Sequence, residues 1–266
     1  MTNSDNDCGK NSQPLVTIIT VCRNSATTIR QSIESVLNQD YNNIEYLVLD
    51  GESADGTLDI LEEYRQANTN RFNFISESDF GLYYAMNRGI EMANGELIGI
   101  INSDDVYHSH AVSEVINVWL ENDRPELVLG STAIMDYSFS NTKGIAKSII
   151  EKSNAHVAIP HPSSFISKRA YSSYGKFDTN FRYAADRDLL LRFIFSGASY
   201  IIVDSVFAYF RQGGLGSRIG ITAQIENFMI DKKYVGTCTA YKNFLTNYFY
   251  SAYKRIRAVT TVKADK

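Results

Sequence analysis

Cysteine is scarce in this chain of 266 residues: the three that occur, Cys8, Cys22 and Cys238, lie far apart. No Cys-x-x-Cys pair and no cluster of cysteine with histidine is present, so neither a disulfide framework nor a zinc site of the usual spacing is indicated. Such isolated thiols are typical of proteins in a reducing cytosol, and we therefore expect a cytoplasmic protein.

Long apolar runs are also absent. No stretch of about 18 apolar residues occurs, so no membrane-spanning helix is expected. Residues 1–13 are polar and have no apolar centre, which argues against a signal peptide and favours a disordered leader. Positive charge is not in excess either: the net charge of −4 argues against a general nucleic-acid binder, and no nucleic-acid partner is expected.

Two glycine-rich fingerprints of phosphate-binding loops are missing. The sequence contains neither the dinucleotide pattern Gly-x-Gly-x-x-Gly nor the phosphate-loop pattern Gly-x-x-x-x-Gly-Lys. Their absence argues against a dehydrogenase and against a P-loop nucleoside triphosphatase. No internal repeat and no linker rich in Pro, Gly and Ser is present, so the sequence indicates no sharp domain boundary.

What the first half does contain is an alternation of short apolar runs with helical patterns. The expected strands are 15–22, 44–49, 72–76, 97–101 and 127–130, and the helices between them are 26–38, one that opens at 55–57, 82–93 and 110–120. Continuous β-branched runs are typical of strands buried on both faces. The order predicts an α/β fold with a Rossmann-like, mostly parallel central sheet that is covered by helices on both faces.

The second half is less regular. We expect short strands at 163–166, 200–203 and 206–210, a helix at 186–195, and edge strands or a loop in 138–153. The chain then ends in helices with an apolar stripe at helical spacing from Tyr241 to Ile256.

The acidic tetrad Asn102-Ser103-Asp104-Asp105 follows the strand at 97–101. In an open α/β sheet, ligands bind beyond the carboxyl ends of the strands. Adjacent carboxylates repel one another unless a positive charge lies beside them, and their hard oxygens suit Mg²⁺ or Mn²⁺. The alternative is that the tetrad is only a turn and a helix cap.

Further acids sit at similar places. Asp50 ends the strand at 44–49, where a carboxylate can accept hydrogen bonds from a base or a ribose, whereas Asp55 is best read as a helix cap. Asp186 and Asp188 open an apolar helix, and each is either a cap or a general base above a substrate.

Two weaker candidates come from the second half. His161 precedes a proline and is either structural or in contact with a substrate. The segment from Arg211 to Ser217 has three glycines that allow close approach of the backbone to a phosphate, with Arg211 or Arg218 as its partner.

Taken in order, these segments resemble a family 2 glycosyltransferase of the GT-A fold. The matching stretches are 16–24, 32–39, 50–57, 76–90, 93–96, the tetrad and the Asp186 region, so the resemblance covers roughly residues 15 to 215. It is closest to bacterial members that build surface polysaccharide, such as those of colanic acid and O-antigen clusters. It implies a glycosyltransferase domain over 14–217, whose nucleotide-binding half ends near 130 and whose acceptor half follows, and a helical tail over 218–266.

The resemblance implies roles for matching residues. The nucleotide-sugar would be contacted by Thr20, Cys22, Asp50, Asp79, Arg88, Asn102 and Asp104. Asp105, rather than Asp104, would hold the Mn²⁺ or Mg²⁺ ion that bridges the donor diphosphate, and Asp186 matches the usual catalytic base. This chain departs from many relatives at Gly51, where they have a second acid, and at Ala185, where they have Glu.

The expected reaction is an inverting transfer of a hexosyl or N-acetylhexosaminyl group. UDP is the expected nucleotide, ahead of GDP and dTDP, and the expected acceptor is a glycan carried on a lipid diphosphate. A sugar-phosphate nucleotidyltransferase is disfavoured, because residues 23–26 after the first strand lack glycine. A non-catalytic scaffold that binds nucleotide-sugars is disfavoured by the retained acids.

The tail carries basic residues with interleaved aromatic ones. From 232 onward only one acid, Asp265, stands against eight bases: Lys232, Lys233, Lys242, Lys254, Arg255, Arg257, Lys263 and Lys266. Such a segment can lie on the inner face of the cytoplasmic membrane as a peripheral contact. The alternative is a helix that packs on the core and leaves a solvated basic face.

Overall fold

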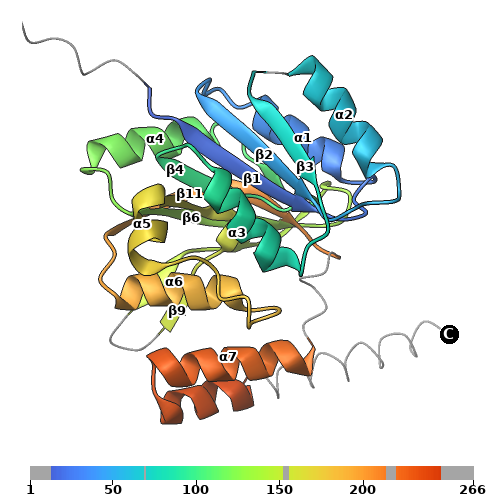
Figure 1. Ribbon diagram of the computed structural model, residues 1–266. Helices are drawn as coiled ribbons and strands as arrows, with labels where there is room; N and C mark the ends of the chain where they lie inside the picture. Colours follow the sequence, from blue (N-terminus) through green and yellow to red (C-terminus); the bar gives the residue numbers. More distant parts are fainter. Residues whose placement is uncertain (1–12, 69, 152–155, 214–219, 247–266) are drawn as a thin grey trace, which may run out of the picture.

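The computed structural model describes residues 13–68, 70–151, 156–213 and 220–246, and all statements about structure refer to these residues. A nine-stranded sheet forms its centre, with strand order β3-β2-β1-β4-β10-β6-β11-β5 and β7 paired with β6 (Figure 1). The expected α/β fold is confirmed.

The first half of the sheet is parallel. Its strands are β1 (Val16–Cys22), β2 (Ile44–Asp50), β3 (Phe72–Ser76) and β4 (Leu97–Ile100), close to the expected ranges. The helices between them are α1 (Ile29–Leu37), α2 (Thr57–Ala67) and α3 (Leu82–Met92). Side chains alternate along each strand, so Ile18 of β1 joins the core under α1 and α2, while Ile19 joins the core under α3.

The second half is mixed. Its elements are β5 (Val106–Tyr107), α4 (Ala111–Glu121), β6 (Leu127–Met135), β7 (Thr142–Ala146), β10 (Ser164–Ser167), α5 (Lys168–Tyr174), α6 (Ala185–Phe195) and β11 (Tyr200–Arg211). Strand β10 lies between β4 and β6 and is antiparallel to both, whereas β11 is parallel to β6. The chain returns from β6 through β7, β8 (Ile149–Glu151), β9 (His156–Ala158) and the short turn η2 (His161–Ser163) rather than through a crossover helix, so β10 enters the sheet reversed.

Two expected strands prove to be one. Residues 200–203 and 206–210 belong to β11, which pairs with β6 along its length and shifts register between Ile202 and Val206 and again between Val206 and Ala208. These irregularities bend a continuous strand, and the sequence pattern breaks at the same place. Strand β6 likewise continues beyond the expected residue 130 to Met135.

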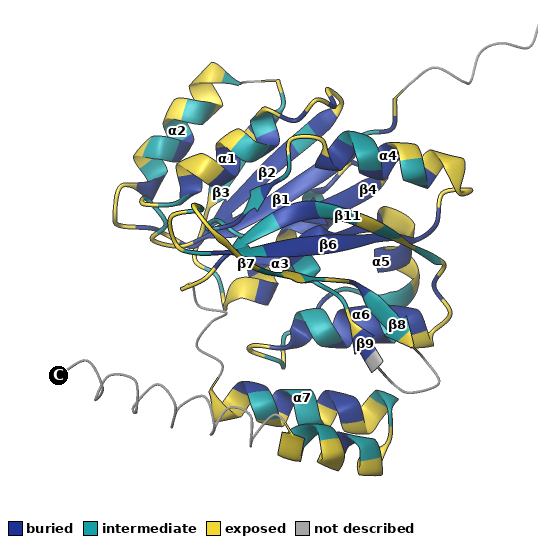
Figure 2. Ribbon diagram, turned by 180° about the vertical axis from the view of Figure 1, so that it is seen from behind, coloured by how far each residue is buried: buried dark blue, intermediate teal, exposed yellow. Residues whose placement is uncertain are grey.

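The chain continues into α7 (Ile221–Tyr234), and residues 237–246 form a further helical segment. Helix α7 packs beside α6, where Ile230 joins Leu191 and Val157 in a small core (Figures 1 and 2). Most of the predicted apolar stripe, from Tyr248 to Ile256, lies outside the described residues. Within the described part of the chain, no helix has the length and apolar character needed to cross a bilayer.

Candidate active site

Residues that are distant in sequence meet at one edge of the sheet. Asp50 ends β2, the acidic tetrad follows β4, and Arg211 ends β11. These strands run in the same direction, so their carboxyl ends reach the same edge, which is where ligands bind in open α/β sheets.

Asp50 is 2 % exposed, and both of its carboxylate oxygens accept hydrogen bonds. Oδ1 accepts from Ser53 Oγ at 2.5 Å and from the Cys22 thiol at 3.5 Å. Oδ2 accepts from the Ser53 backbone amide at 3.0 Å and from Ser76 Oγ at 2.7 Å. Burial, aided by the charge of Asp50, raises the pKa of Cys22 well above its usual range, so the thiol stays protonated as a donor. Asp50 therefore organises the turn after β2.

Thr20 lies in the core rather than at an open surface. Its side chain is fully buried, and its hydroxyl pairs with Tyr46 Oη at 3.0 Å. The structure therefore corrects the expectation that Thr20 lines the nucleoside pocket: β1 is buried along its whole length, and this side chain faces the layer of α1 and α2.

A cavity of ≈ 370 Å³ brings together three of the predicted nucleotide-binding residues, Asp50, Asp79 and Arg88. Asp79 Oδ1 accepts a hydrogen bond from the Gly81 amide at 2.8 Å. A Cβ atom at Gly51 would lie only 2.9 Å from Asp79 Oδ2, so the carboxylate of Asp79 occupies the space beside the position where many relatives have a second acid. Arg88 is half-exposed and lies 3.6 Å from Glu77.

Two aromatic residues that the sequence did not single out as site residues also line this cavity. Phe80 is 89 % exposed and Tyr84 is 46 % exposed, and their ring centroids lie 5.5 Å apart on the cavity wall. Exposed aromatic faces offer a stacking surface for a planar base. Their positions next to Asp79 on the turn into α3 were the available signal, but aromatic residues on a helix are more often part of a core.

In the tetrad, the two acids have different surroundings. Asp105 is fully buried, with Oδ1 accepting from the Arg211 backbone amide at 2.9 Å and Oδ2 from Asn102 Nδ2 at 2.9 Å. Burial, with the charge of Asp104, raises the pKa of Asp105 to about 7. The Asp104 carboxylate is part-buried, which raises its pKa, and within the described residues the only hydrogen bond to it comes from its own amide.

This geometry favours Asp104 as the acid that is open to a ligand, whereas the sequence favours Asp105 as the metal ligand; which of the two holds an ion stays a prediction. Both oxygens of Asp105 are engaged within the protein, whereas Asp104 has carboxylate oxygens left for a ligand. Asn102 donates its amide hydrogen to Asp105, and its predicted contact with the donor stays a prediction. Ser103, expected to be a spacer, pairs with Ser25 Oγ at 2.9 Å.

Arg211 supplies positive charge beside these acids. Its side chain is buried, and Nε donates to the Asp104 carbonyl oxygen at 2.9 Å. The rest of the guanidinium donates to the carbonyl of Tyr137 and to Gln31, and lies 4.1 Å from the centroid of the Phe139 ring. Arg211 therefore clamps the tetrad loop, which corrects the expectation that it binds phosphate. Ser217, the other residue expected there, lies outside the described residues.

The tetrad fits a divalent cation that the protein holds with few ligands. Among the described residues, no group of three or more His, Cys, Asp or Glu side chains could enclose an ion. Mg²⁺ is usually bound by one or two carboxylates together with substrate phosphates, not by an all-protein cage. The part-buried, under-solvated carboxylate of Asp104 matches that requirement.

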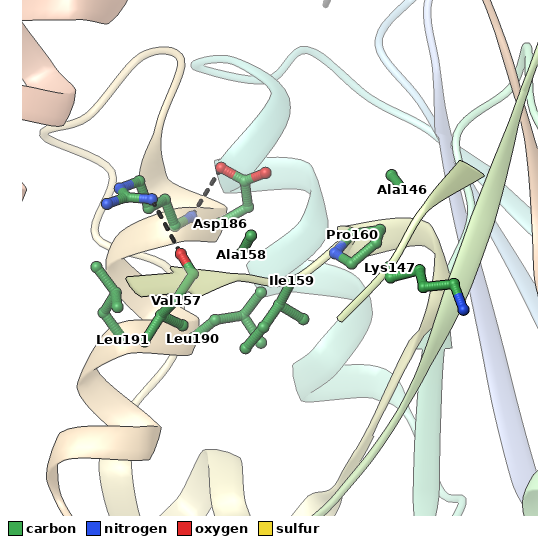
Figure 3. A pocket seen from close by; sticks show the side chains of 10 residues that line it. Ala146, Lys147, Val157, Ala158, Ile159, Pro160, Asp186, Leu190 and Leu191 are labelled. Carbon is green, nitrogen blue, oxygen red and sulfur yellow. Dashed lines mark hydrogen bonds between the residues drawn. The ribbon is translucent and has the colours of Figure 1, made fainter. Parts of the chain in front are cut away.

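Asp186 lies in the first turn of α6 on the wall of a second cavity, of ≈ 320 Å³ (Figure 3). Apolar side chains form much of that wall: Val157, Ile159, Leu190 and Leu191. Asp186 Oδ1 accepts from the Arg187 amide at 2.8 Å and from Tyr83 Oη at 3.4 Å. Asp188, two residues on, is instead buried and bound to Lys233 and Tyr234, each at 3.0 Å.

His161 is an electrostatic neighbour of Asp186. Burial lowers the pKa of His161, and the negative charge of Asp186 opposes that shift. The histidine ring lies edge-on to Phe177, with centroids 5.8 Å apart. The structure thus places His161 near the candidate base, although the imidazole does not line the second cavity.

The sequence analysis also missed Glu226 of α7. Its carboxylate is buried and accepts from the backbone amides of Arg182, Tyr183 and Ala184 at 2.9, 2.8 and 3.0 Å. These residues lead directly into the turn that carries Asp186. Because the bonded residues lie 42 to 44 positions apart, no local pattern reveals the contact. Helix α7 is therefore part of the architecture that positions Asp186.

Glu226→Gln should reduce the turnover number by roughly tenfold and leave donor affinity unchanged. The amide has one acceptor oxygen and would turn N–H donors toward a backbone amide, and an unpaired buried donor costs about 1–3 kcal/mol. A loss of about 1.4 kcal/mol at the transition state is tenfold in rate. Steady-state kinetics would separate kcat from KM, and the pH profile should also move, since Asp186 would be displaced.

The matched control is Glu121→Gln, the same change at an exposed position on α4. Glu226→Asp should recover part of the activity. A Glu226→Gln enzyme with unaltered kcat and pH profile would remove Glu226 from the active-site architecture.

Comparison with known proteins identifies the family. The model described as Glycosyl transferase family 2 matches residues 17–173, more than half of the chain. The chain belongs to this family. The matched residues include Asp50, the tetrad and β10, so the family assignment covers the edge of the sheet described above.

Relatives within the family are similar over different lengths. A protein named as glycosyltransferase EpsH of Bacillus subtilis (strain 168) is 38% identical over 116 residues, which is 44% of this chain and 30% of EpsH. A protein named as glycosyltransferase EpsE of the same organism is 27% identical over 256 residues, covering 93% of this chain and 90% of EpsE.

Solved structures share the GT-A fold. Residues 1–349 of S. aureus TarS in complex with UDP-GlcNAc superpose with a TM-score of 0.65 at 18% identity, covering 81% of this chain and 65% of that one. Mannosyltransferase PcManGT from Pyrobaculum calidifontis, in complex with GDP-Man and Mn²⁺, gives a TM-score of 0.57 at 18% identity and covers 84% and 62%. At these identities the likeness establishes the fold.

Proposed function

We propose that the protein transfers a sugar from a nucleotide-sugar to an acceptor hydroxyl, with inversion, during synthesis of a bacterial surface polysaccharide. The observation that carries this proposal is the arrangement of acids in a family 2 chain: Asp50 and Asp79 line one cavity and Asp186 lines a second. Asp104 follows β4 and lies at the same edge of the sheet as Asp50. The names of relatives support the setting: one B. subtilis relative, 30% identical over 42% of this chain, is named for teichuronic acid biosynthesis.

The donor base would occupy the cavity of Asp79 and Arg88, against the rings of Phe80 and Tyr84. We propose UDP as the nucleotide, carrying a hexose or an N-acetylhexosamine, because TarS was solved with UDP-GlcNAc. GDP is second, since PcManGT was solved with GDP-Man. The Asp79 carboxylate beside Gly51 would take the place of the second acid in recognising the base.

Asp104, supported by Asp105, would hold Mn²⁺ or Mg²⁺ together with the donor diphosphate. When bound, such an ion stabilises the negative charge that develops on the departing nucleoside diphosphate. Arg211 keeps the tetrad loop in position through its bonds to Asp104 and Asp105.

Asp186 would act as the general base. Its carboxylate accepts the proton of the acceptor hydroxyl, whose oxygen attacks the anomeric carbon from the face opposite the leaving group. Tyr83 Oη and the Arg187 amide orient the carboxylate, and Glu226 holds the preceding backbone. Apolar side chains, among them Leu190 and Leu191, line the cavity beside the base.

We propose that the acceptor is a glycan on a lipid diphosphate at the inner face of the cytoplasmic membrane. The apolar cavity beside Asp186 supports an acceptor with an apolar portion near the reacting hydroxyl. We retain 14–217 as the catalytic domain, with a donor half up to about residue 130, and add α7 to it because Glu226 contacts the turn before Asp186.

A thermal-shift panel of nucleoside diphosphates, each with and without Mn²⁺, tests the donor assignment. A ligand that binds only the folded state stabilises it by about 2.7 kcal/mol at a hundredfold excess over Kd. UDP with Mn²⁺ should therefore raise the unfolding temperature by several degrees, more than GDP or dTDP and more than UDP with EDTA. If no nucleoside diphosphate raised it, a nucleotide-sugar donor would be the wrong substrate class.

A further inference from the structure

We propose that the outward side of α7 and of residues 237–246 docks on an anionic lipid bilayer. This surface, here called the α7 face, consists of five large apolar residues and two lysines: Ile221, Ile225, Met229, Tyr241, Leu245, Lys232 and Lys242. It shares Lys232 and Lys242 with the basic tail that the sequence indicated, but its apolar part on α7 precedes that tail.

The apolar part of the α7 face consists of two rows of exposed residues on successive helical segments. Ile221, Ile225 and Met229 recur every four residues on one side of α7 and are 53%, 46% and 56% exposed. Tyr241 and Leu245, again four apart, are 56% and 50% exposed on the next helical segment. Scattered single apolar residues are normal on a surface, whereas a row of this kind marks an interaction site.

In residues 220–246, the acidic side chains are buried and basic side chains are exposed. The two acids, Glu226 and Asp231, are buried and face inward, where Glu226 binds the backbone before α6 and Asp231 pairs with Arg187 at 2.5 Å. Lys232 and Lys242, in contrast, are exposed, whereas the ammonium of Lys233 pairs with the buried Asp188 of α6. The exposed residues among 220–246 therefore include apolar and positively charged ones but no acid.

Charge complementarity favours an anionic bilayer over a second copy of the chain or the chain's own residues 247–266 as the partner of this surface. A second copy docked symmetrically would bring its lysines against the same lysines, at an electrostatic cost. The chain's own residues 247–266 carry five bases and one acid, so they would meet like charge as well. A surface of anionic headgroups over acyl chains satisfies both the lysines and the apolar rows.

Docking through this face would leave the catalytic side of α7 undisturbed. Glu226 and Asp231 project from the side opposite the apolar row of α7 and hold the start of α6, where Asp186 lies. If the proposed function holds, a lipid-linked acceptor would then reach Asp186 from the surface on which the enzyme rests. The docking itself does not depend on the reaction and can be measured without substrate.

Vesicle flotation of the full chain tests this proposal, using phosphatidylcholine vesicles with and without phosphatidylglycerol. Wild type should float with the anionic vesicles, and added salt should weaken the association. Lys232→Gln with Lys242→Gln should weaken binding roughly 10- to 30-fold, because each lysine near an anionic surface contributes about 1 kcal/mol of binding free energy. Ile221→Ser, Ile225→Ser and Met229→Ser combined should weaken it by at least roughly tenfold. Lys233 is left intact because it binds Asp188.

The matched controls make the same changes on other surfaces. Leu120→Ser and Ile145→Ser alter residues that are 44% and 54% exposed, and Lys143→Gln removes an exposed lysine from β7. All three should bind vesicles as wild type does, and circular dichroism would confirm that every variant is folded.

The proposal is overturned if wild type does not bind anionic vesicles, or if the α7-face variants bind as strongly as wild type. It is equally overturned if those variants only convert a dimer into a monomer in light scattering. A failed donor panel with intact vesicle binding would refute the proposed function alone.

Discussion

Asp186→Asn should lower the rate of sugar transfer by roughly 10²- to 10⁴-fold, the usual contribution of a general base. Asparagine has nearly the shape of aspartate and can still accept the Arg187 amide and Tyr83 hydroxyl hydrogen bonds, but it cannot take a proton from the acceptor. Donor affinity should be unchanged, because Asp186 lies on the wall of the second cavity rather than on that of Asp79 and Arg88.

The measurement is single-turnover transfer of a radiolabelled sugar, with donor affinity determined separately by calorimetry. Asp123→Asn is a suitable control, since Asp123 is exposed and its φ of 55° is a conformation that asparagine tolerates well. A turnover near that of wild type in Asp186→Asn would exclude this residue as the base.

Asp104→Asn should weaken metal-dependent donor binding by at least roughly tenfold, while the unfolding temperature of the free protein stays close to that of wild type. The carboxylate is the open member of the acidic pair, and loss of even a supporting group at a metal site costs about 10–100-fold in metal affinity. The thermal shift produced by UDP with Mn²⁺ would report the loss.

Asp105→Ala provides the contrast. It removes the acceptor for the Arg211 and Asn102 donors inside the protein, and each unpaired buried donor costs about 1–3 kcal/mol of folding free energy. This variant should therefore unfold at a lower temperature even without ligand. If Asp104→Asn retained the full metal-dependent shift while Asp105→Ala lost it without being destabilised, the order of the two acids expected from sequence would be the right one.

Much of the parallel half of the fold could be predicted, because its signals are local. A strand such as Val16–Cys22 is a continuous apolar run, and the helix that follows shows its own period. Once parallel order is inferred, the acids after β2 and β4 must reach one edge. Strand β10 was visible as an apolar segment, but its place between β4 and β6 depends on pairing partners far away in sequence.

The roles of individual acids could not be predicted in the same way. Asp104 and Asp105 are neighbours with identical side chains, and what separates them is the amide of Arg211, 106 residues away. In the sequence, Gly51 stands where many relatives have a second acid. In the folded protein, the carboxylate of Asp79 lies beside that position. Glu226 carried no pattern at all, since its partners are backbone amides brought close only when α7 packs on α6.

The amino-acid order alone was enough for the family, the α/β class and the placement of Asp50 and the tetrad at one edge of the sheet. These follow from period, turn chemistry and motif order, which act between residues close in the chain. Only the tertiary structure shows that the oxygens of Asp105 accept hydrogen bonds within the protein while the Asp104 carboxylate is left for a ligand. It also shows that Arg211 binds the tetrad loop and that the side chain of Thr20 is buried in the core. Glu226 of α7 binds the turn before Asp186. The physical reason is that burial and hydrogen-bond satisfaction of a side chain depend on groups distant in sequence, which meet only when the sheet and its helices close around them.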